Sequence, residues 1–270
     1  MIIDFHNHYY PPEFLDRIRS EPSNFRVTDD DEGNPVLHSP GDYNVIVPGH
    51  RDIDFRVSAL DEAGVDKQVL TFTAPGTSIE SPERAAELAT IVNDGLASAR
   101  DRYPERFTAL AHLPLNNPDA ALRELNRVLD DLSFPGIMLY SNVGGLPLAD
   151  EQFWPIYERA DEAGAVIYIH PTYPLGVEAM EEFMLMPLVG FLMDTTLATA
   201  HLIYAGVPER FPGIHWVLCH TGGAIPFLAE RLDRGFEAYP RCRARISRPP
   251  SEYLRDFYYD TVNFDSACLQ

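Results

Sequence analysis

The chain of 270 residues is 45% hydrophobic and 23% charged, which suits one large folded domain and argues against disorder over its length. Its net charge of −20 argues against nucleic-acid binding and against docking on anionic membranes, because phosphate groups would be repelled. The charge is compatible with an anionic small substrate, since one or two arginines can reverse the potential inside a cleft.

Short apolar runs alternate with longer segments of helical periodicity along the chain. We predict strands at Ile2–His8, Lys67–Thr73, Phe107–Leu113, Gly136–Tyr140, Val166–His170, His215–His220 and Phe257–Val262. We predict helices at Phe55–Ala63, Pro82–Arg102, Pro118–Leu132, Glu151–Ala163, Leu192–Ala205 and Ala224–Phe236. Prolines after Ser81 and Asn117 mark two helix starts, and Gly64 and Gly164 mark two helix ends. This alternation predicts an α/β fold in which helices connect parallel strands.

The number and order of these strands predict a (β/α)8 TIM-like barrel that forms a single domain over residues 1–270. Only seven strands are found, and an apparent helix at Ser266–Gln270 follows the seventh, so we expect strand eight to lie beyond Gln270. Residues 9–52 are too long and too polar for a simple loop. We interpret them as a small insertion after strand one, such as a hairpin that caps the barrel mouth.

The first predicted strand ends with the sequence Asp4-Phe5-His6-Asn7-His8. Because side chains alternate along a strand, His6 and His8 should point the same way, with Asp4 below them. Phe5 should then point outward and pack under the helices. Two imidazoles at a strand end suit zinc, iron or manganese. Taken alone, the pair is equally compatible with two histidines that bind no metal.

Two more histidines end predicted strands. His170 follows the apolar run 165–169, and His220 follows the run 216–219. In a barrel of this type the C-terminal ends of the strands form the catalytic face. Each histidine on its own could be a hydrogen-bonded structural residue, but four of them at the ends of strands one, five and six indicate a single site.

With these motifs in this order, the sequence resembles the amidohydrolase-related family, in the group that contains aminocarboxymuconate-semialdehyde decarboxylase. The resemblance extends through essentially the whole chain. It rests on Ile3-Asp4-Phe5-His6-Asn7-His8, Phe55-Arg56, Asp61-Glu62-Ala63-Gly64-Val65-Asp66, Ile169-His170-Pro171, His220-Thr221-Gly222-Gly223 and Pro249-Pro250-Ser251-Glu252-Tyr253.

The resemblance implies that His6, His8 and His170 bind one divalent metal ion, usually Zn²⁺, with Mn²⁺ as the alternative. It implies that His220 is the acid/base that acts on metal-bound water. Arg231 matches an arginine that reaches the neighbouring subunit's site and holds a substrate carboxylate, which implies a homodimer. The alternative interpretation of Arg231 is an exposed helix residue.

The sequence departs from this family at three places. The family takes its last metal ligand from an aspartate on strand eight, and neither Asp260 nor Asp265 is assigned that role, because both lie too early in the chain. The second substrate arginine of the family's insertion loop has no counterpart in residues 41–46, and Thr172 stands where the decarboxylase has tryptophan. These differences indicate a substrate other than that decarboxylase's own.

Together these features favour a metal-dependent, non-oxidative decarboxylase of a small unsaturated or aromatic carboxylic acid. The alternative is a metal-dependent hydrolase or hydratase of a small lactone, amide or ring-cleavage product, because the same site supports either chemistry. A third interpretation, from a different class, is a metal-binding or scaffold protein without turnover.

The cysteine content and the N-terminus bear on the compartment. The three cysteines, Cys219, Cys242 and Cys268, form no CxxC motif and indicate free thiols in a reducing environment. The N-terminus lacks a basic stretch followed by an apolar run, and no stretch of about 18 consecutive apolar residues is found. We therefore predict a cytoplasmic protein without a transmembrane helix.

Overall fold

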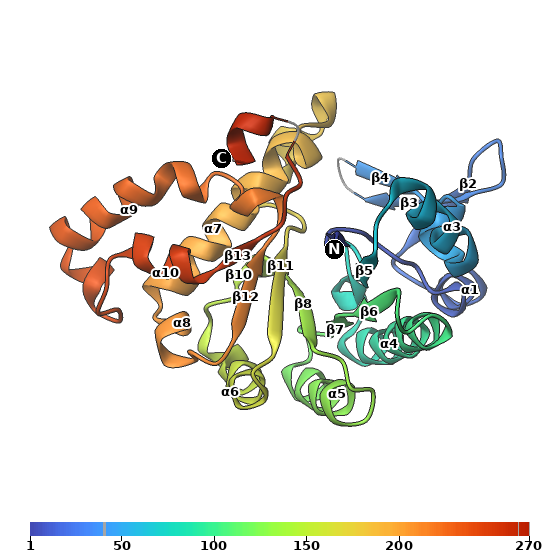
Figure 1. The fold of residues 1–270 in the computed structure, drawn as a ribbon, viewed down its shortest axis with the longest axis horizontal. Helices are drawn as coiled ribbons and strands as arrows, with labels where there is room; N and C mark the ends of the chain where they lie inside the picture. Colours follow the sequence, from blue (N-terminus) through green and yellow to red (C-terminus); the bar gives the residue numbers. More distant parts are fainter. Residues whose placement is uncertain (40–41, 264, 270) are drawn as a thin grey trace.

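The computed structural model of the chain describes residues 1–39, 42–263 and 265–269. Parallel strands form its centre, and helices cover their outer side (Figure 1). One sheet has the strand order β1-β5-β6 and a second has the order β7-β8-β11-β12-β13, so each strand lies beside its predecessor in the chain. The predicted α/β fold, with parallel strands joined by helices, is confirmed.

The strands of the central layer are short, and each begins in or near one of the predicted apolar runs. Their bounds are β1 (Ile3–Asp4), β5 (Lys67–Leu70), β6 (Phe107–Ala109), β7 (Ala111–His112), β8 (Gly136–Tyr140), β11 (Val166–His170), β12 (His215–Leu218) and β13 (Tyr258–Tyr259). A hairpin of β9 (Asn142–Val143) and β10 (Leu146–Pro147) follows β8.

The helices also lie near the predicted positions. Those that cover the central strands are α3 (Ile53–Ala63), α4 (Pro82–Arg102), α5 (Pro118–Asp130), α6 (Trp154–Ala163) and α7 (Phe191–Tyr204), while α9 (Ile225–Ala238) lies farther out and packs against α10 (Pro250–Asp256) and α7. The short helices α8 (Val207–Arg210) and α10 were not predicted. The Ser81 side chain caps α4 and the Asn117 side chain caps α5, each with proline in the first turn. Gly64 and Gly164 end their helices in the left-handed conformation, as the sequence predicts.

The two parallel sheets join at β6 and β7, which only Leu110 separates. The Leu110 N–H donates to the Leu70 carbonyl at 3.0 Å, so the run 107–112 carries the pairing from one sheet to the next. Among the described residues, β1 and β13 each pair on one side only. A cavity of about 530 Å³ lies against both of these edges, and Phe5, Val217 and Tyr258 line it.

The segment between β1 and α3 is folded. It contains α1 (Pro12–Ser20), an antiparallel sheet of β2 (Arg26–Asp29), β3 (Pro35–Ser39) and β4 (Asp42–Val45), and α2 (Pro48–Arg51). The sequence suggests a hairpin here, whereas the structure has three paired strands and two helices. Phe14 of α1 packs edge-on against Phe72, with ring centroids 4.8 Å apart, so the segment is anchored where the chain leaves β5.

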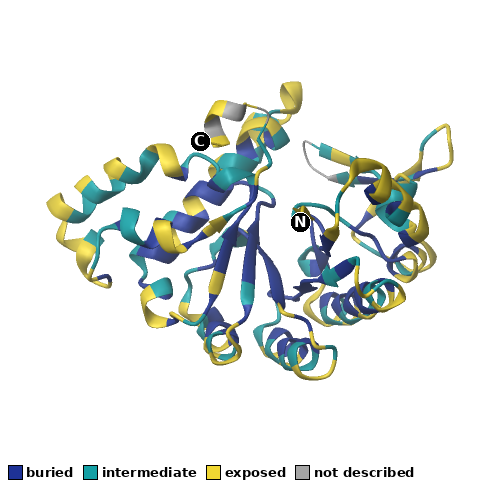
Figure 2. Ribbon diagram, viewed as in Figure 1, coloured by how far each residue is buried: buried dark blue, intermediate teal, exposed yellow. Residues whose placement is uncertain are grey.

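The inner strands, such as β8 and β11, are buried, whereas Ile3 of β1 and Tyr258 of β13 at the two edges are exposed, as are the outer sides of the covering helices (Figure 2). One cluster, which includes Val69, Met138 and Tyr168, fills the interior of the strand layer. Phe5 packs against it, with its ring centroid 5.2 Å from that of Tyr168. The prediction that Phe5 lies under the helices is therefore wrong.

Asp4 likewise does not share a face with the two histidines. Its carboxylate accepts a hydrogen bond from the Gln68 side chain, which also bonds Arg56 of α3, so Asp4 lies toward the helices. The reason is that β1 ends at Asp4 and the backbone bends at His6. The alternation rule holds only along a continuous strand.

The segment Glu182–Tyr204 is long and apolar enough to cross a membrane by length and composition alone, with a mean hydropathy of 1.5. In the structure, α7 at its C-terminal end packs Leu202 and Ile203 into the core and buries Asp194 and Thr199. The opposite face of α7, with Met193 and Leu197, is exposed. A helix with one buried and one exposed face is typical of the outer layer of a folded domain. The absence of a membrane-spanning helix stays a prediction.

Candidate metal centre

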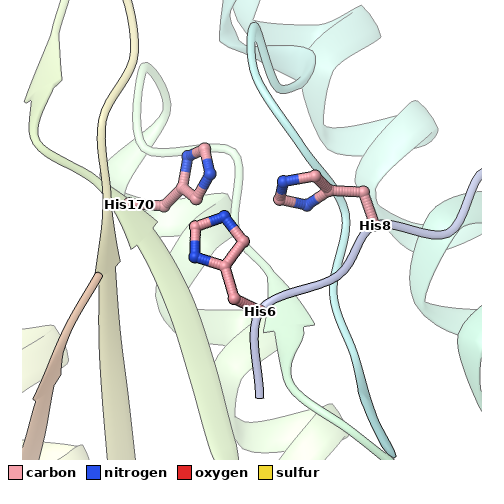
Figure 3. A group of neighbouring side chains, drawn as sticks. All are labelled: His6, His8 and His170. Atoms are coloured by element: carbon pink, nitrogen blue, oxygen red, sulfur yellow. The ribbon is translucent and has the colours of Figure 1, made fainter. Parts of the chain in front are cut away.

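Three of the histidines singled out in the sequence converge on one point. His6 and His8 come from the segment after β1, and His170 comes from the end of β11 (Figure 3). One ligand nitrogen from each ring can be chosen so that all three lie within 4.8 Å of one another. The ring centroids are 5.3 Å apart for His6 and His8, and 4.8 Å apart for His8 and His170. The structure thus assembles the predicted trio.

Buried polar contacts fix the His6-Asn7-His8 segment, although it is not part of a strand. The Asn7 side chain donates to the Val69 carbonyl at 2.9 Å and accepts from Arg56 at 2.6 Å. Arg56, which is only 5% exposed, also donates to the His8 carbonyl and to Gln68. The family motif around Arg56 therefore has a structural role: its guanidinium holds the backbone between the two histidines.

Nδ1 of each of the three rings lies next to a hydrogen-bond acceptor. His6 Nδ1 lies 2.6 Å from an Asp260 carboxylate oxygen, and His170 Nδ1 lies 2.7 Å from the Pro171 carbonyl oxygen. His8 Nδ1 lies 3.3 Å from the Thr71 hydroxyl, whose own proton is donated to the Asn7 carbonyl.

These acceptors determine which nitrogen carries the proton. A carboxylate and a carbonyl can only accept, so Nδ1 of His6 and of His170 must be protonated, and His8 follows the same pattern. In that tautomer the lone pair is on Nε2, the nitrogen that a metal would bind. The donor set fits a divalent ion, because three imidazoles present Nε2 to one point and a contact at Nδ1 fixes the orientation of each ring.

Burial keeps the imidazoles of His8 and His170 neutral. Burial, together with the neighbouring histidines, lowers the pKa of His8 and of His170 well below 6.5. A metal ligand must be unprotonated, so the same burial that destabilises imidazolium prepares the site for a cation.

His220 lies beside this trio. Its ring centroid is 4.7 Å from that of His6 and 6.0 Å from that of His170. His220 has a positive φ of 51°, in the left-handed region, which directs its side chain off the end of β12. Its Nδ1 lies 3.1 Å from the sulfur of the buried Cys219. Burial, with a further contribution from His6, lowers the pKa of His220 to about 4.

The sequence analysis set Asp260 aside, yet the structure places it in this cluster. Its side chain is 2% exposed and bonds both His6 and the Tyr168 hydroxyl. Burial acts to raise the pKa of Asp260, but the hydrogen bonds from His6, Tyr168 and the Thr221 backbone outweigh it and lower the pKa to about 2. One signal could have identified Asp260: it ends an apolar strand, as His170 does.

Arg231 is not brought to the metal centre by its own chain. It is exposed on α9, where it borders a surface hollow of about 610 Å³ together with Phe227, Arg234 and Tyr239. Its predicted role depends on a second subunit and stays a prediction.

A second cavity, of about 360 Å³, opens at the C-terminal ends of the central strands. Leu113, Met138, Tyr140 and Tyr173 are among the residues that line it. The Tyr140 ring centroid is 6.2 Å from that of His170, so this cavity adjoins the histidine cluster. Its size and largely apolar lining suit a small ring-containing molecule.

The chain is similar to known proteins over most of its length. A sequence profile of the amidohydrolase family matches residues 3–267. The 2-amino-3-carboxymuconate-6-semialdehyde decarboxylase of Dictyostelium discoideum is 35% identical over 222 residues, which are 81% of this chain and 62% of that protein. The chain thus spans less than two thirds of that relative's length.

Two solved structures with the same fold are each 26% identical to this chain. The 5-carboxyvanillate decarboxylase of Sphingomonas paucimobilis matches with a TM-score of 0.84 and 26% identity, over 99% of this chain and 83% of that one. The dihydroxybenzoic acid decarboxylase of Polaromonas sp. JS666, with manganese and the inhibitor 2-nitroresorcinol bound, matches with a TM-score of 0.78 and 26% identity, over 99% and 80% of the two chains. With a family profile that covers almost its whole length, the chain belongs to the amidohydrolase family.

Proposed function

We propose that the protein is a metal-dependent, non-oxidative decarboxylase of a small aromatic or unsaturated carboxylic acid. The observation that carries this proposal is the cluster of His6, His8 and His170 with His220 beside it. The names of the similar proteins support decarboxylation in particular, because they act on different acids but are all decarboxylases.

The chain's own residues supply two parts of such a reaction, and the metal ion that they would bind supplies a third. The apolar cavity beside His170 binds the ring or the unsaturated chain and excludes water from it. A divalent ion held by His6, His8 and His170 would supply Lewis-acid stabilisation of negative charge on substrate oxygens. His220 is neutral at pH 7, so it can take a proton from a hydroxyl or water in the site and return it to the carbon that loses carbon dioxide.

Zn²⁺ is our first choice for the metal, since a site with three imidazoles is typical of zinc. Mn²⁺ is the alternative, and the Polaromonas neighbour was solved with manganese bound. Elemental analysis of the purified chain distinguishes the two.

We further propose that a closed barrel forms when an eighth strand fills the cavity between β1 and β13. Both flanking strands have unpaired edges there among the described residues. Unpaired backbone N–H and C=O groups at a sheet edge promote pairing with other chains and aggregation. From the family resemblance, we expect this strand to bring an aspartate to the metal. The coding sequence that follows Gln270 tests this: we expect a Ser-Asp dipeptide within a few tens of codons, and a stop codon directly after Gln270 would contradict it.

We also propose a cytoplasmic homodimer in which α9 lies near the partner's site, so that Arg231 can hold a substrate carboxylate there. Phe227 of α9 and Tyr239, which directly follows this helix, are 90% and 64% exposed, and large apolar side chains of this kind often mark an interface. The buried Cys219 and the partly buried Cys242 are both free thiols, which suits a reducing compartment. Sedimentation velocity should show a dimer that Phe227→Asp weakens; a monomeric wild type would contradict the proposal.

Carbon dioxide release decides the main proposal. The chain loaded with Zn²⁺ or Mn²⁺ is incubated with a panel of hydroxylated benzoic acids and small unsaturated acids, in parallel with lactones, amides and esters. We expect carbon dioxide from at least one acid, and none from the same acid with the His170→Ala variant. Hydrolysis without any carbon dioxide would instead identify the protein as a hydrolase.

A further inference from the structure

We propose that Asp260 is a positioning residue that holds both halves of the active site: the metal ligand His6 and the turn that carries His220. This inference rests on the proposed metal-dependent function. It assigns a role to a carboxylate that is neither a member of the three-histidine cluster nor a match to the family's aspartate on strand eight.

Each oxygen of Asp260 serves one half of the site. Oδ2 accepts from His6 Nδ1 at 2.6 Å and from the Tyr168 hydroxyl at 2.8 Å. Oδ1 accepts from the backbone N–H of Thr221 at 3.1 Å and from that of Val262 at 3.1 Å. With four donors on two oxygens, the carboxylate has one fixed orientation.

The contact with His6 is the carboxylate–histidine–metal arrangement. A carboxylate on Nδ1 fixes the ring orientation and makes Nε2 a better donor to a cation. His8 and His170 have a hydroxyl and a carbonyl in the corresponding position, so His6 is the one ligand of the trio with a charged partner among the described residues. The negative charge of Asp260 also offsets part of the cation's charge, which the three neutral rings cannot do.

The contact with Thr221 serves the acid/base. His220 and Thr221 both have positive φ angles, of 51° and 54°, a backbone conformation that costs free energy for residues other than glycine. The bond from the Thr221 N–H to Asp260 helps to stabilise this turn. One side chain thus sets the relative positions of the ligand and of the imidazole whose ring lies 4.7 Å from it.

The Asp260→Asn variant tests this inference sharply. Asparagine has nearly the same shape but only one accepting oxygen, and its NH₂ group must face either the donors on the His6 side or the donors on the Thr221 side. We expect the dissociation constant for Zn²⁺, measured by competition with a chromophoric chelator on the full chain, to rise about 10- to 100-fold. Asp265→Asn is the matched control, because it removes the same charge from an exposed residue nearby, and it should leave the affinity unchanged.

A second readout separates positioning from general destabilisation. In the chain loaded with Co²⁺, the exchangeable Nδ1 proton of His6 should give a shifted NMR resonance whose position Asp265→Asn keeps and Asp260→Asn changes, because the charged acceptor of this proton is removed. If Asp260→Asn does not fold, Tyr168→Phe replaces it: loss of one hydrogen bond to the same carboxylate should weaken Zn²⁺ binding about 2- to 10-fold.

Three outcomes would overturn the inference. Zn²⁺ affinity of a folded Asp260→Asn equal to the wild type's would overturn it and leave the proposed function standing. If Asp260→Asn does not fold, an unchanged Zn²⁺ affinity of a folded Tyr168→Phe would overturn the inference in the same way. A wild-type chain that binds no more Zn²⁺ than His170→Ala would overturn the metal site itself, and the role of Asp260 with it.

Discussion

The His170→Ala variant is expected to lose its divalent ion and, with it, all turnover. His170 is 2% exposed and contributes one of the three nitrogens that meet at the candidate centre. A protein site of this kind binds zinc with about 10–16 kcal/mol, so each of three or four ligands contributes roughly 3–5 kcal/mol. Loss of one ligand should therefore raise the dissociation constant about 10²- to 10⁴-fold.

Elemental analysis of protein purified without chelator measures this directly. We expect about one ion per chain in the wild type and well under that in His170→Ala, at equal protein concentration. The double variant His6→Ala/His8→Ala should behave in the same way. His201→Ala is the control, because His201 is exposed on α7, and it should keep the wild-type metal content. Equal metal in all of these variants would mean that the three histidines are not the ligands.

The histidine trio could be predicted from sequence because the underlying rule is topological. Parallel strands joined by helices all end on the same face, so histidines that end separate strands must lie near one another. His170 ends β11, as predicted, and His220 lies two residues beyond the last residue of β12, which ends earlier than the predicted strand. No side-chain packing had to be known for this argument.

The failures of the prediction lie where the backbone leaves regular structure. The face assigned to Phe5 assumed that β1 continues to His8, whereas it ends at Asp4. What then orients His6 and His8 is Arg56, whose buried guanidinium bonds Asn7 and the His8 carbonyl across about 50 residues of sequence. Contacts over such a separation leave no periodic signal in the sequence.

Asp260 shows the same limit at the site itself. It was judged only as a metal ligand, by comparison with the family's aspartate on strand eight, and it was set aside because of its position. In the structure it does not belong to the histidine trio itself but accepts hydrogen bonds from the ligand His6 and from Tyr168. Residues that act through another residue carry no spacing motif of their own, so they become visible only when the distances are known.

The His220→Ala variant is expected to keep its metal but lose turnover by about 10²- to 10⁴-fold, the usual effect of losing a positioned acid/base. Metal binding and turnover should respond differently because the trio of ligands does not include His220, whose Nδ1 contacts the sulfur of Cys219. Its other nitrogen can then exchange a proton with the substrate beside the metal. His220→Asn should be equally inactive, since an amide does not titrate in this range.

Metal content and rate measured on the same sample decide between the two possible roles of His220. Full metal with a rate that has fallen at least about 10²-fold supports the acid/base role. Loss of the ion from His220→Ala would make His220 a ligand, and the proton would then have to come from elsewhere. A rate close to that of the wild type would remove His220 from the reaction, although its ring lies only 4.7 Å from that of His6. The His201→Ala variant is again the control, because His201 lies outside the site and a lower rate in this variant would reflect loss of active protein during purification.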